Sequence, residues 1–404
     1  MSRPFRLSRS FGFVLKLALA APCLLPAASD PAPGGVLPPA LVTTSGRVVT
    51  NAAEWETLRR PEVLELFREH VYGRAPVGRP AELAFVPLGE DEAAFDGLAI
   101  RRRVRVAYAG TGSESGIDVT LYLPAAARPR GCFLLIVNRS RRIIDAAEES
   151  PDPFWPVRDI VARGYATAAF HNSDAAPDRA ADGFKSGVFA HFDSPDGERS
   201  PDAWGTIAAW SWGASRVIDW LAAEPELRDI PLAVVGHSRG GKAALWCGAQ
   251  DERVALTVSN NSGSTGAALA RTTRGETIQM INTTFPHWFA ANYHRYNDDP
   301  ASLPVDQHLL LALMAPRRVY VASASRDAHA DPAAEFQAAV EAAPVFALYQ
   351  LDGVGPAGLP APGQPRHGGA IGHHLREGGH NLVVEDWHHF LDYADRCLPA
   401  SAGR

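Results

Sequence analysis

The sequence of 404 residues predicts an α/β fold with a mostly parallel central sheet that is flanked by helices. Short, continuous apolar runs recur along the chain, and such runs are typical of strands that are buried on both faces of a sheet. Segments with the apolar spacing of helices lie between these runs, so strands and helices alternate. With 46% hydrophobic and 21% charged residues, the chain can bury a large core and does not have the composition of a disordered segment.

The first 29 residues have the pattern of a secretory signal. Four Arg and Lys residues precede an apolar run at 17–28, and small residues follow as far as Ser29. The run is too short to span a bilayer, so we expect residues 1–29 to be a signal peptide and the protein to be secreted or periplasmic. A retained membrane anchor is the alternative. Residues 30–46 are rich in Pro, Gly and Ala, and are expected to form a flexible linker.

Residues 47–398 are expected to form one domain, followed by a short tail at 399–404. Helical spacing predicts a first helix at 54–72, and alternating apolar and polar residues predict half-buried strands at 101–108 and 117–123. The apolar runs that predict buried strands lie at 132–137, 166–170, 232–235, 254–258, 319–322 and 345–351. Helical patterns lie at 155–163, 204–223, 240–250, 331–342 and 384–396, and a Gly- and Pro-rich stretch at 353–369 predicts an exposed loop.

Charge and cysteine content disfavour several classes of protein. The formal net charge is 39 − 45 = −6, so the chain is a poor candidate for binding nucleic acid. After the predicted signal, no apolar run is long enough to span a membrane. Cys132, Cys247 and Cys397 remain in the mature chain, so at most one intramolecular disulfide can form, and a disulfide scaffold is excluded.

The strongest local signal is the segment Gly236-His237-Ser238-Arg239-Gly240. It follows a predicted buried strand and opens a predicted helix, which is the context of a nucleophile elbow. Small residues flank the serine because the turn is tight, and the helix N-terminus directs free N–H groups at the reacting oxygen. We therefore predict that Ser238 is a nucleophile; a helix-capping serine in a Gly-rich turn is the alternative.

A serine nucleophile needs a histidine base and an acid that orients the base. In α/β-hydrolases these follow in the order Ser, acid, His. Asp327 lies shortly after the predicted strand 319–322, and Asp331 is its competitor, although Asp331 is also a natural helix cap. His380 is the expected base, in a Gly-rich loop before the last helix. His373, His374, His388 and His389 are also within reach of the base position. The spacing of these histidines matches no metal signature, so no metal is expected. No cofactor is expected, because a serine triad needs none.

At these residues the sequence resembles the glucuronoyl esterases of carbohydrate esterase family 15. The segment from Gly236 to Lys242 is similar to the family motif G-x-S-R-x-G-K. Further similar segments occur in the family's order at 59–74, 182–184, 201–205, 262–263, 275–277, 285–288, 303–308, 374–380 and 386–387. The resemblance covers roughly residues 50–396 and implies an α/β-hydrolase fold.

The resemblance implies a serine esterase that hydrolyses esters of (4-O-methyl-)glucuronic acid, as found between glucuronoxylan and lignin. It implies that Ser238 is the nucleophile and His380 the base, and that Arg239 stabilises the oxyanion. It further implies that Lys242 and Glu276 bind hydroxyls of the uronic acid. A charged side chain suits a sugar hydroxyl, and a cation beside the carbonyl stabilises developing negative charge. Trp288 is a candidate for the wall of the substrate pocket. We expect a monomer.

Two positions depart from the family pattern. Many members carry a triad Glu where this chain has Asn261, and an amide cannot stabilise the imidazolium by charge. The acid is therefore expected to be Asp327. A Trp that commonly follows this Asp is replaced by His329, so the sugar contact there should be weaker or the ester preference different. An esterase for acetyl or other small acyl groups, and a non-catalytic carbohydrate-binding relative, are the alternative functions.

Overall fold

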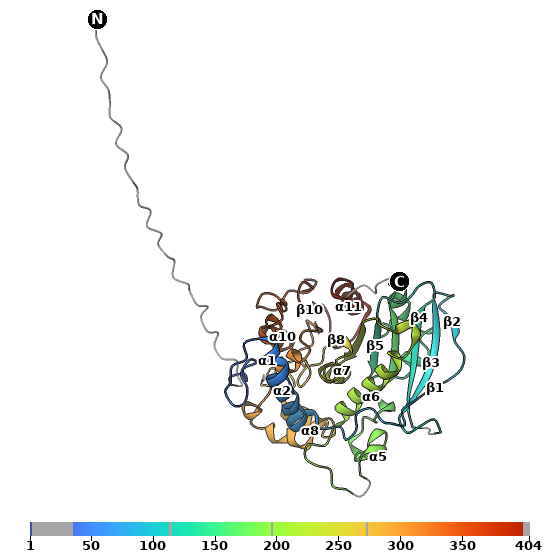
Figure 1. Cartoon of the computed structure of the whole chain (residues 1–404), viewed down its shortest axis with the longest axis horizontal. Helices are drawn as coiled ribbons and strands as arrows, with labels where there is room; N and C mark the ends of the chain where they lie inside the picture. Colours follow the sequence, from blue (N-terminus) through green and yellow to red (C-terminus); the bar gives the residue numbers. More distant parts are fainter. Residues whose placement is uncertain (2–34, 113–114, 195–196, 272–273, 399–404) are drawn as a thin grey trace. The chain divides into compact units, whose positions relative to one another are not determined.

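The computed structural model describes residues 1, 35–112, 115–194, 197–271 and 274–398. The fold described below lies within the unit Ala32–Arg404 (Figure 1). The predicted signal peptide, most of the predicted linker and the tail at 399–404 lie outside the described residues. In the described part, no helix is both long and apolar enough to cross a membrane.

One sheet forms the centre of this unit, with strand order β1-β3-β4-β6-β5-β7-β8-β9-β10 and with β2 paired to β3. Strands from β6 to β10 in this order run parallel, whereas β1, β3 and β4 add an antiparallel edge. The strands are β1 (Ala84–Pro87), β2 (Glu92–Ala94), β3 (Ala99–Ala107), β4 (Ile117–Pro124), β5 (Cys132–Val137), β6 (Ala166–His171), β7 (Leu232–His237), β8 (Val254–Asn260), β9 (Arg318–Ala324) and β10 (Ile371–Arg376).

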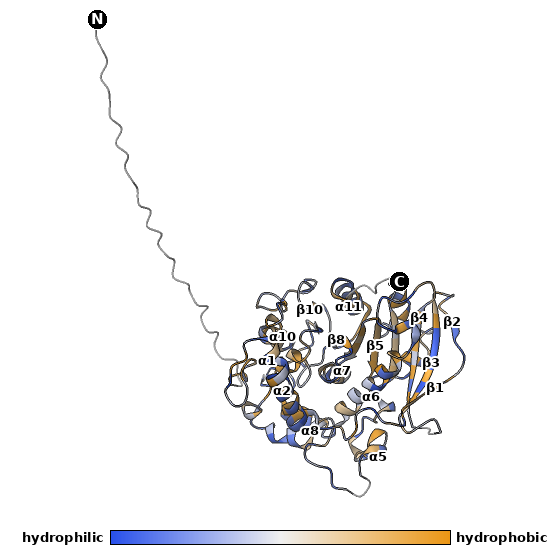
Figure 2. Ribbon diagram, in the orientation of Figure 1, coloured by the Kyte–Doolittle hydropathy of each residue, from blue (hydrophilic) through white to orange (hydrophobic). Residues whose placement is uncertain are grey.

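Helices cover both faces of the sheet, which confirms the predicted fold class. Along β7, Val234 belongs to one apolar cluster, and Ala233 and Val235 belong to a second cluster. The first cluster includes residues of α2, α6, α7, α9 and α10, and the second includes residues of α4 and α11. Because each central strand has apolar neighbours on both faces, its sequence is a continuous apolar run, which Figure 2 shows as orange strands.

The helices that surround the sheet are α1 (Ala52–Glu54), α2 (Arg60–Phe67), α3 (Arg142–Asp145), α4 (Val157–Ala162), α5 (Val188–Phe192), α6 (Thr206–Leu221), α7 (Arg239–Gln250), α8 (Ile278–Thr284), α9 (Gln307–Ala312), α10 (Pro332–Ala347) and α11 (Val384–Cys397). The predicted helix at 54–72 is one continuous helical segment in which α1 and α2 alternate with the π-helical turns η1 (Trp55–Arg59) and η2 (Arg68–Tyr72).

The prediction of a strand at 345–351 is wrong. Residues 345–347 are the end of α10, and the last strand is β10, which runs parallel to β9. The apolar residues at the end of α10 are consecutive because the helix is buried there, with Val345 and Phe346 inaccessible to solvent. The sequence of β10 contains His373 and His374 where a central strand usually has apolar residues, which hid this strand from pattern analysis.

Residues 38–46 also differ from the expected flexible linker, because they pack on the domain. The backbone oxygen of Pro38 lies 2.9 Å from Nε2 of His308, and Arg59 donates from Nε to the backbone oxygen of Ala40 at 3.3 Å. Val42 forms an isolated bridge with Val48. The packed part of the chain therefore begins before residue 46.

Candidate active site

A sharp turn between β7 and α7 presents Ser238 at the carboxyl edge of the sheet. The strand ends at His237 and the helix begins at Arg239, so Ser238 alone makes the turn, with φ 56° and ψ −125°. A non-glycine residue with positive φ is strained, and such strain is typical of a nucleophile elbow. A Cβ at Gly236 would lie 2.0 Å from the backbone oxygen of Gly240, so only glycine fits before the turn.

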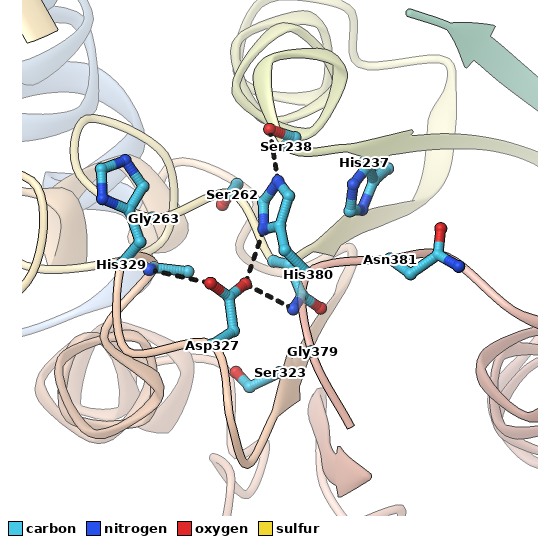
Figure 3. Close-up of polar contacts among 12 residues, drawn as sticks. His237, Ser238, Ser262, Gly263, Ser323, Asp327, His329, Gly379, His380 and Asn381 are labelled. Carbon is cyan, nitrogen blue, oxygen red and sulfur yellow. Dashed lines mark hydrogen bonds and ion pairs between the residues drawn. The ribbon is translucent and has the colours of Figure 1, made fainter. Parts of the chain in front are cut away.

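Three side chains from distant segments form a hydrogen-bonded chain at this edge (Figure 3). Nε2 of His380 lies 2.9 Å from Oγ of Ser238, and Nδ1 of His380 lies 2.6 Å from Oδ2 of Asp327. Asp327 follows β9 and His380 follows β10, and parallel strands end at the same edge of a sheet. The competitor Asp331 instead caps α10 by accepting a hydrogen bond from the N–H of Ala334 at 3.2 Å.

Asp327 is buried, with 4% of its surface exposed. Burial alone would raise the pKa of Asp327, but hydrogen bonds from His380 and Asn261 outweigh burial and lower the pKa below its usual range. Nδ2 of Asn261 donates at 2.7 Å to the same carboxylate oxygen that faces His380. Asn261 stands where many family members carry a Glu, and here its amide orients the carboxylate of Asp327.

His237 is a second histidine at the site, and its role was not predicted from the sequence. Its ring is buried and lies 4.5 Å from the His380 ring, centroid to centroid. Nδ1 lies 2.6 Å from Oδ1 of Asn260, and Nε2 lies 3.2 Å from Nη2 of Arg139. Burial, followed by the charge of His380, lowers the pKa of His237 to about 3. His237 is therefore neutral at neutral pH. It packs beside His380 and does not take up a proton that His380 would accept.

Arg239, the predicted oxyanion residue, is held by a partly buried carboxylate. Its guanidinium forms an ion pair with Asp178 and lies 5.2 Å from the ring centroid of Trp288. Asp178 also accepts a hydrogen bond from Nε1 of Trp288 at 2.8 Å and faces Nε2 of His287 at 2.9 Å. Trp288 itself is buried and stacks on Phe285 at 3.7 Å. In this structure Trp288 supports Arg239, and its contact with substrate stays a prediction.

The other predicted substrate residues form a polar chain that runs inward from the surface. The exposed His329 lies 3.3 Å, through Nε2, from Oε1 of Glu276, and Oε2 of Glu276 lies 3.5 Å from Nζ of Lys242. The ammonium of Lys242 also donates to the backbone oxygens of Ser262 and Ser264. The Lys242 side chain is 3% exposed, so its direct contact with a sugar stays a prediction.

The remaining histidines are separate from this chain of residues. His373 and His374 are buried on β10, where Nε2 of His374 lies 2.8 Å from Asp386. His388 and His389 lie on α11. Within the described residues, no group of three or more His, Cys, Asp or Glu side chains is placed to hold a metal ion.

The fold agrees with comparisons to known proteins. A family model described as glucuronyl esterase, fungi, matches residues 154–349. A carbohydrate esterase from an unknown prokaryotic organism is 36% identical over 401 residues, which cover 92% of this chain and 91% of the relative. A 4-O-methyl-glucuronoyl methylesterase from Schizophyllum commune is 30% identical over 310 residues, which cover 74% and 70%.

Solved structures give the same result. A glucuronoyl esterase from Solibacter usitatus superposes with a TM-score of 0.85 at 36% identity, over 90% of this chain and 98% of that one. A carbohydrate esterase family 15 glucuronoyl esterase from Teredinibacter turnerae superposes with a TM-score of 0.79 at 31% identity, over 89% of each chain. The chain belongs to the glucuronoyl esterases of carbohydrate esterase family 15, which are carboxylic ester hydrolases with the α/β-hydrolase fold.

Proposed function

We propose that this protein hydrolyses esters of (4-O-methyl-)glucuronic acid through a Ser238–His380–Asp327 triad. The observation that carries the proposal is the chain of hydrogen bonds from Ser238 through both nitrogens of His380 to a buried carboxylate. The curated relative from Schizophyllum commune is named as a 4-O-methyl-glucuronoyl methylesterase, which supports a uronate ester as the substrate. Esters between glucuronoxylan and lignin are the proposed natural context, and secretion or periplasmic export and a monomeric state belong to the same proposal.

The reaction begins when Nε2 of His380 takes the proton of Ser238 and Oγ attacks the ester carbonyl. The negative charge that develops on the carbonyl oxygen faces the N-terminus of α7 and the Arg239 guanidinium. Collapse of the intermediate breaks the bond to the alcohol, which leaves with the proton from His380. Water, activated by the same base, then cleaves the acyl-enzyme. Asp327 keeps the imidazole oriented and stabilises its protonated form.

The uronic acid is proposed to lie on the side of Ser238 where the exposed His329 contacts the largely buried Glu276. His329 is 62% exposed and hydrogen-bonds the Glu276 carboxylate, so sugar hydroxyls can bind both side chains. Lys242 would support this subsite without touching the sugar, because its ammonium contacts Glu276 and the backbone of the turn at 262–264. A histidine ring covers less sugar surface than a tryptophan, so this subsite would rely more on hydrogen bonds than on stacking.

A substrate panel tests the proposal. Wild-type protein is assayed with methyl glucuronate and with an acetylated xylose, and each assay is repeated with Ser238→Ala. We expect turnover of the uronate ester in preference to the acetyl ester, and none above background for Ser238→Ala. Ser302→Ala, at an exposed serine that bonds the backbone of Asp299, is the matched control and should keep full activity. A preference for the acetyl ester would overturn the substrate assignment, and failure of wild type to react with a fluorophosphonate probe would overturn the catalytic one.

A further inference from the structure

An arginine outside the triad lies at the mouth of the candidate active site. Arg139 is exposed in the loop that follows β5, the strand beside β7. This loop packs on the nucleophile elbow, since a Cβ at Gly240 would lie 3.4 Å from Oδ1 of Asn138. Nη2 of Arg139 lies 3.2 Å from Nε2 of His237 and 3.5 Å from the backbone oxygen of His380. The guanidinium is therefore next to the catalytic base.

The charge of Arg139 is not matched by an acid at close range. Two neighbouring arginines at the same edge each hold a carboxylate: Arg141 pairs with Asp174, and Arg239 pairs with Asp178. In the part of the chain that the structure describes, no carboxylate lies within ion-pair distance of Arg139. Its polar contacts are with a neutral imidazole and a carbonyl oxygen, so no partner neutralises its charge at close range.

Two further side chains define the surroundings of this cation. The guanidinium carbon lies 5.1 Å from the ring centroid of Phe154, which fixes one face of the group. Burial lowers the pKa of Arg139, and the carboxylate of Asp152, which accepts a hydrogen bond from the N–H of Phe154 at 2.9 Å, opposes this shift. Arg139 is thus supported on one side by Phe154 and remains accessible on the other.

Strand order places Arg139 on the side of Ser238 that the sugar does not occupy. The sheet runs β5-β7-β8-β9, with Ser238 at the end of β7. Glu276 and His329, the proposed sugar ligands, follow β8 and β9. Arg139 follows β5, on the opposite side of the nucleophile strand. An ester carbonyl at Ser238 has the sugar on one side and the alcohol on the other, so Arg139 faces the alcohol.

We propose that Arg139 forms a subsite for the alcohol part of the ester and favours alcohols that carry a carboxylate. This inference rests on the proposed function, because it needs the uronic acid on the opposite side. Arg139 takes no part in the bond changes: the ester bond breaks as described above, and the alcohol oxygen receives its proton from His380. The guanidinium supplies charge attraction before and during that step.

A pair of esters of matched size tests the inference. Benzyl glucuronate has a neutral alcohol, and 4-carboxybenzyl glucuronate adds one negative charge. The readout is the ratio of kcat/KM for the charged ester to kcat/KM for the neutral one. We expect Arg139→Gln to lower this ratio about fivefold, the effect of one exposed charge pair. Raising the salt to about 0.5 M should lower the wild-type ratio and leave the Arg139→Gln ratio unchanged, because salt screens exposed charges.

Two control variants separate charge at the site from other effects. Arg139→Lys keeps the charge and should restore most of the ratio. Arg128→Gln removes the same charge at the other end of β5, where Arg128 donates to the backbone oxygen of Arg228; it should leave the ratio at the wild-type value. An equal loss on both esters in Arg139→Gln would show that Arg139 acts through His380 or by stacking on the aromatic ring, and would overturn the proposal. Inactivity of wild type on both esters would instead overturn the proposed function.

Discussion

At the scale of single residues, the charge of Asp327 is the feature on which the proposed base depends. Its neighbour Asn261 contributes a hydrogen bond and no charge. We therefore expect Asp327→Asn to lower kcat by about 10³- to 10⁴-fold, as loss of a triad carboxylate does elsewhere. Asp331→Asn is the control: Asp331 caps α10, and an amide oxygen can accept the same hydrogen bond from the N–H of Ala334, so this variant should keep both its stability and its kcat. Steady-state kinetics and thermal melts measure both, and similar kcat values for the two variants would contradict the assignment.

The ion pair between Asp178 and Arg239 gives a second prediction at this scale. Burial would raise the pKa of Asp178, but hydrogen bonds from His287, Trp288 and Arg239 outweigh burial and lower the pKa, so the carboxylate is charged at neutral pH. Without it Arg239 is free to leave the position from which we propose that it stabilises the oxyanion. We expect Asp178→Asn to lower kcat about 10- to 100-fold with little change in KM, because a preorganised donor acts on the transition state.

A double variant checks this interpretation of Asp178. If Asp178 acts by positioning Arg239, then Asp178→Asn combined with Arg239→Gln should be no slower than Arg239→Gln alone. Additive losses would mean that Asp178 affects catalysis by another route, for example through the stability of the loop that contains His287 and Trp288. The test measures kcat, KM and the melting temperature of wild type, the two single variants and the double variant under one set of conditions.

The sequence pointed to three side chains that the structure brings into hydrogen-bonding distance, but not to the residues around them. Ser238 lies in a local pattern of strand, tight turn and helix, and chain order favoured Asp327 and His380 while leaving Asp331 as a competitor. Nothing local connects Asp178 to Arg239, since 61 residues separate them and the contact depends on how a loop packs. The neutral state of His237 likewise follows from burial, which the sequence does not display.

At the scale of elements, the first turn of α10 places a carboxyl group in the interior beneath the site. Glu335 is inaccessible to solvent and accepts a hydrogen bond from the N–H of Gly263 at 2.9 Å and one from Oγ of Ser323 at 2.6 Å. Burial raises the pKa of Glu335 to about 7, although both hydrogen bonds oppose the rise. Through these two hydrogen bonds, Glu335 connects α10 to β9 and to the turn that follows β8.

The raised pKa makes stability depend on pH. The folded state holds the Glu335 proton up to about pH 7, whereas the unfolded state loses it near pH 4.5. Stability from this group therefore falls as pH rises from about 4.5 to about 7, by about 3 kcal/mol, and is constant above that. Glu335→Gln cannot ionise, so its free energy of unfolding should exceed that of wild type by a margin that grows over this window. Urea unfolding at pH 4.5, 6 and 8 measures the margin, and a constant margin would contradict the prediction.

The elements themselves were predictable where burial and periodicity agree. The central strands β5 and β7 have apolar neighbours on both faces, and their runs identified them. Sequence patterns did not predict β10, because its His373 and His374 are buried polar residues. They also predicted a strand at the end of α10, because a buried helix there has the same continuous apolar residues as a strand. Length would have distinguished them, because the apolar run at 345–351 continues a helical pattern that starts at 331.

At the scale of the whole molecule, the charge of the chain depends on whether residues 1–29 are removed. This segment contains four positive charges and no acidic residue, so its loss changes the formal net charge from −6 to −10. A mature enzyme that is this acidic is repelled by an acidic polysaccharide at long range. A cation that no nearby carboxylate pairs with, such as Arg139, would then provide attraction at the candidate site that the chain as a whole does not.

The last prediction concerns the removal of that segment. Expressed with its full sequence in a Gram-negative host, the protein should reach the periplasm with a mass that corresponds to cleavage near Ser29. The apolar run at 17–28 drives export, so Leu19→Arg should leave an uncleaved chain in the cytoplasm. Because the described fold begins after this segment, a chain that starts at residue 30 should have the esterase activity of the exported protein. Mass spectrometry of the periplasmic and cytoplasmic fractions measures the cleavage, and an exported wild-type chain of full mass would show that the segment is retained as an anchor.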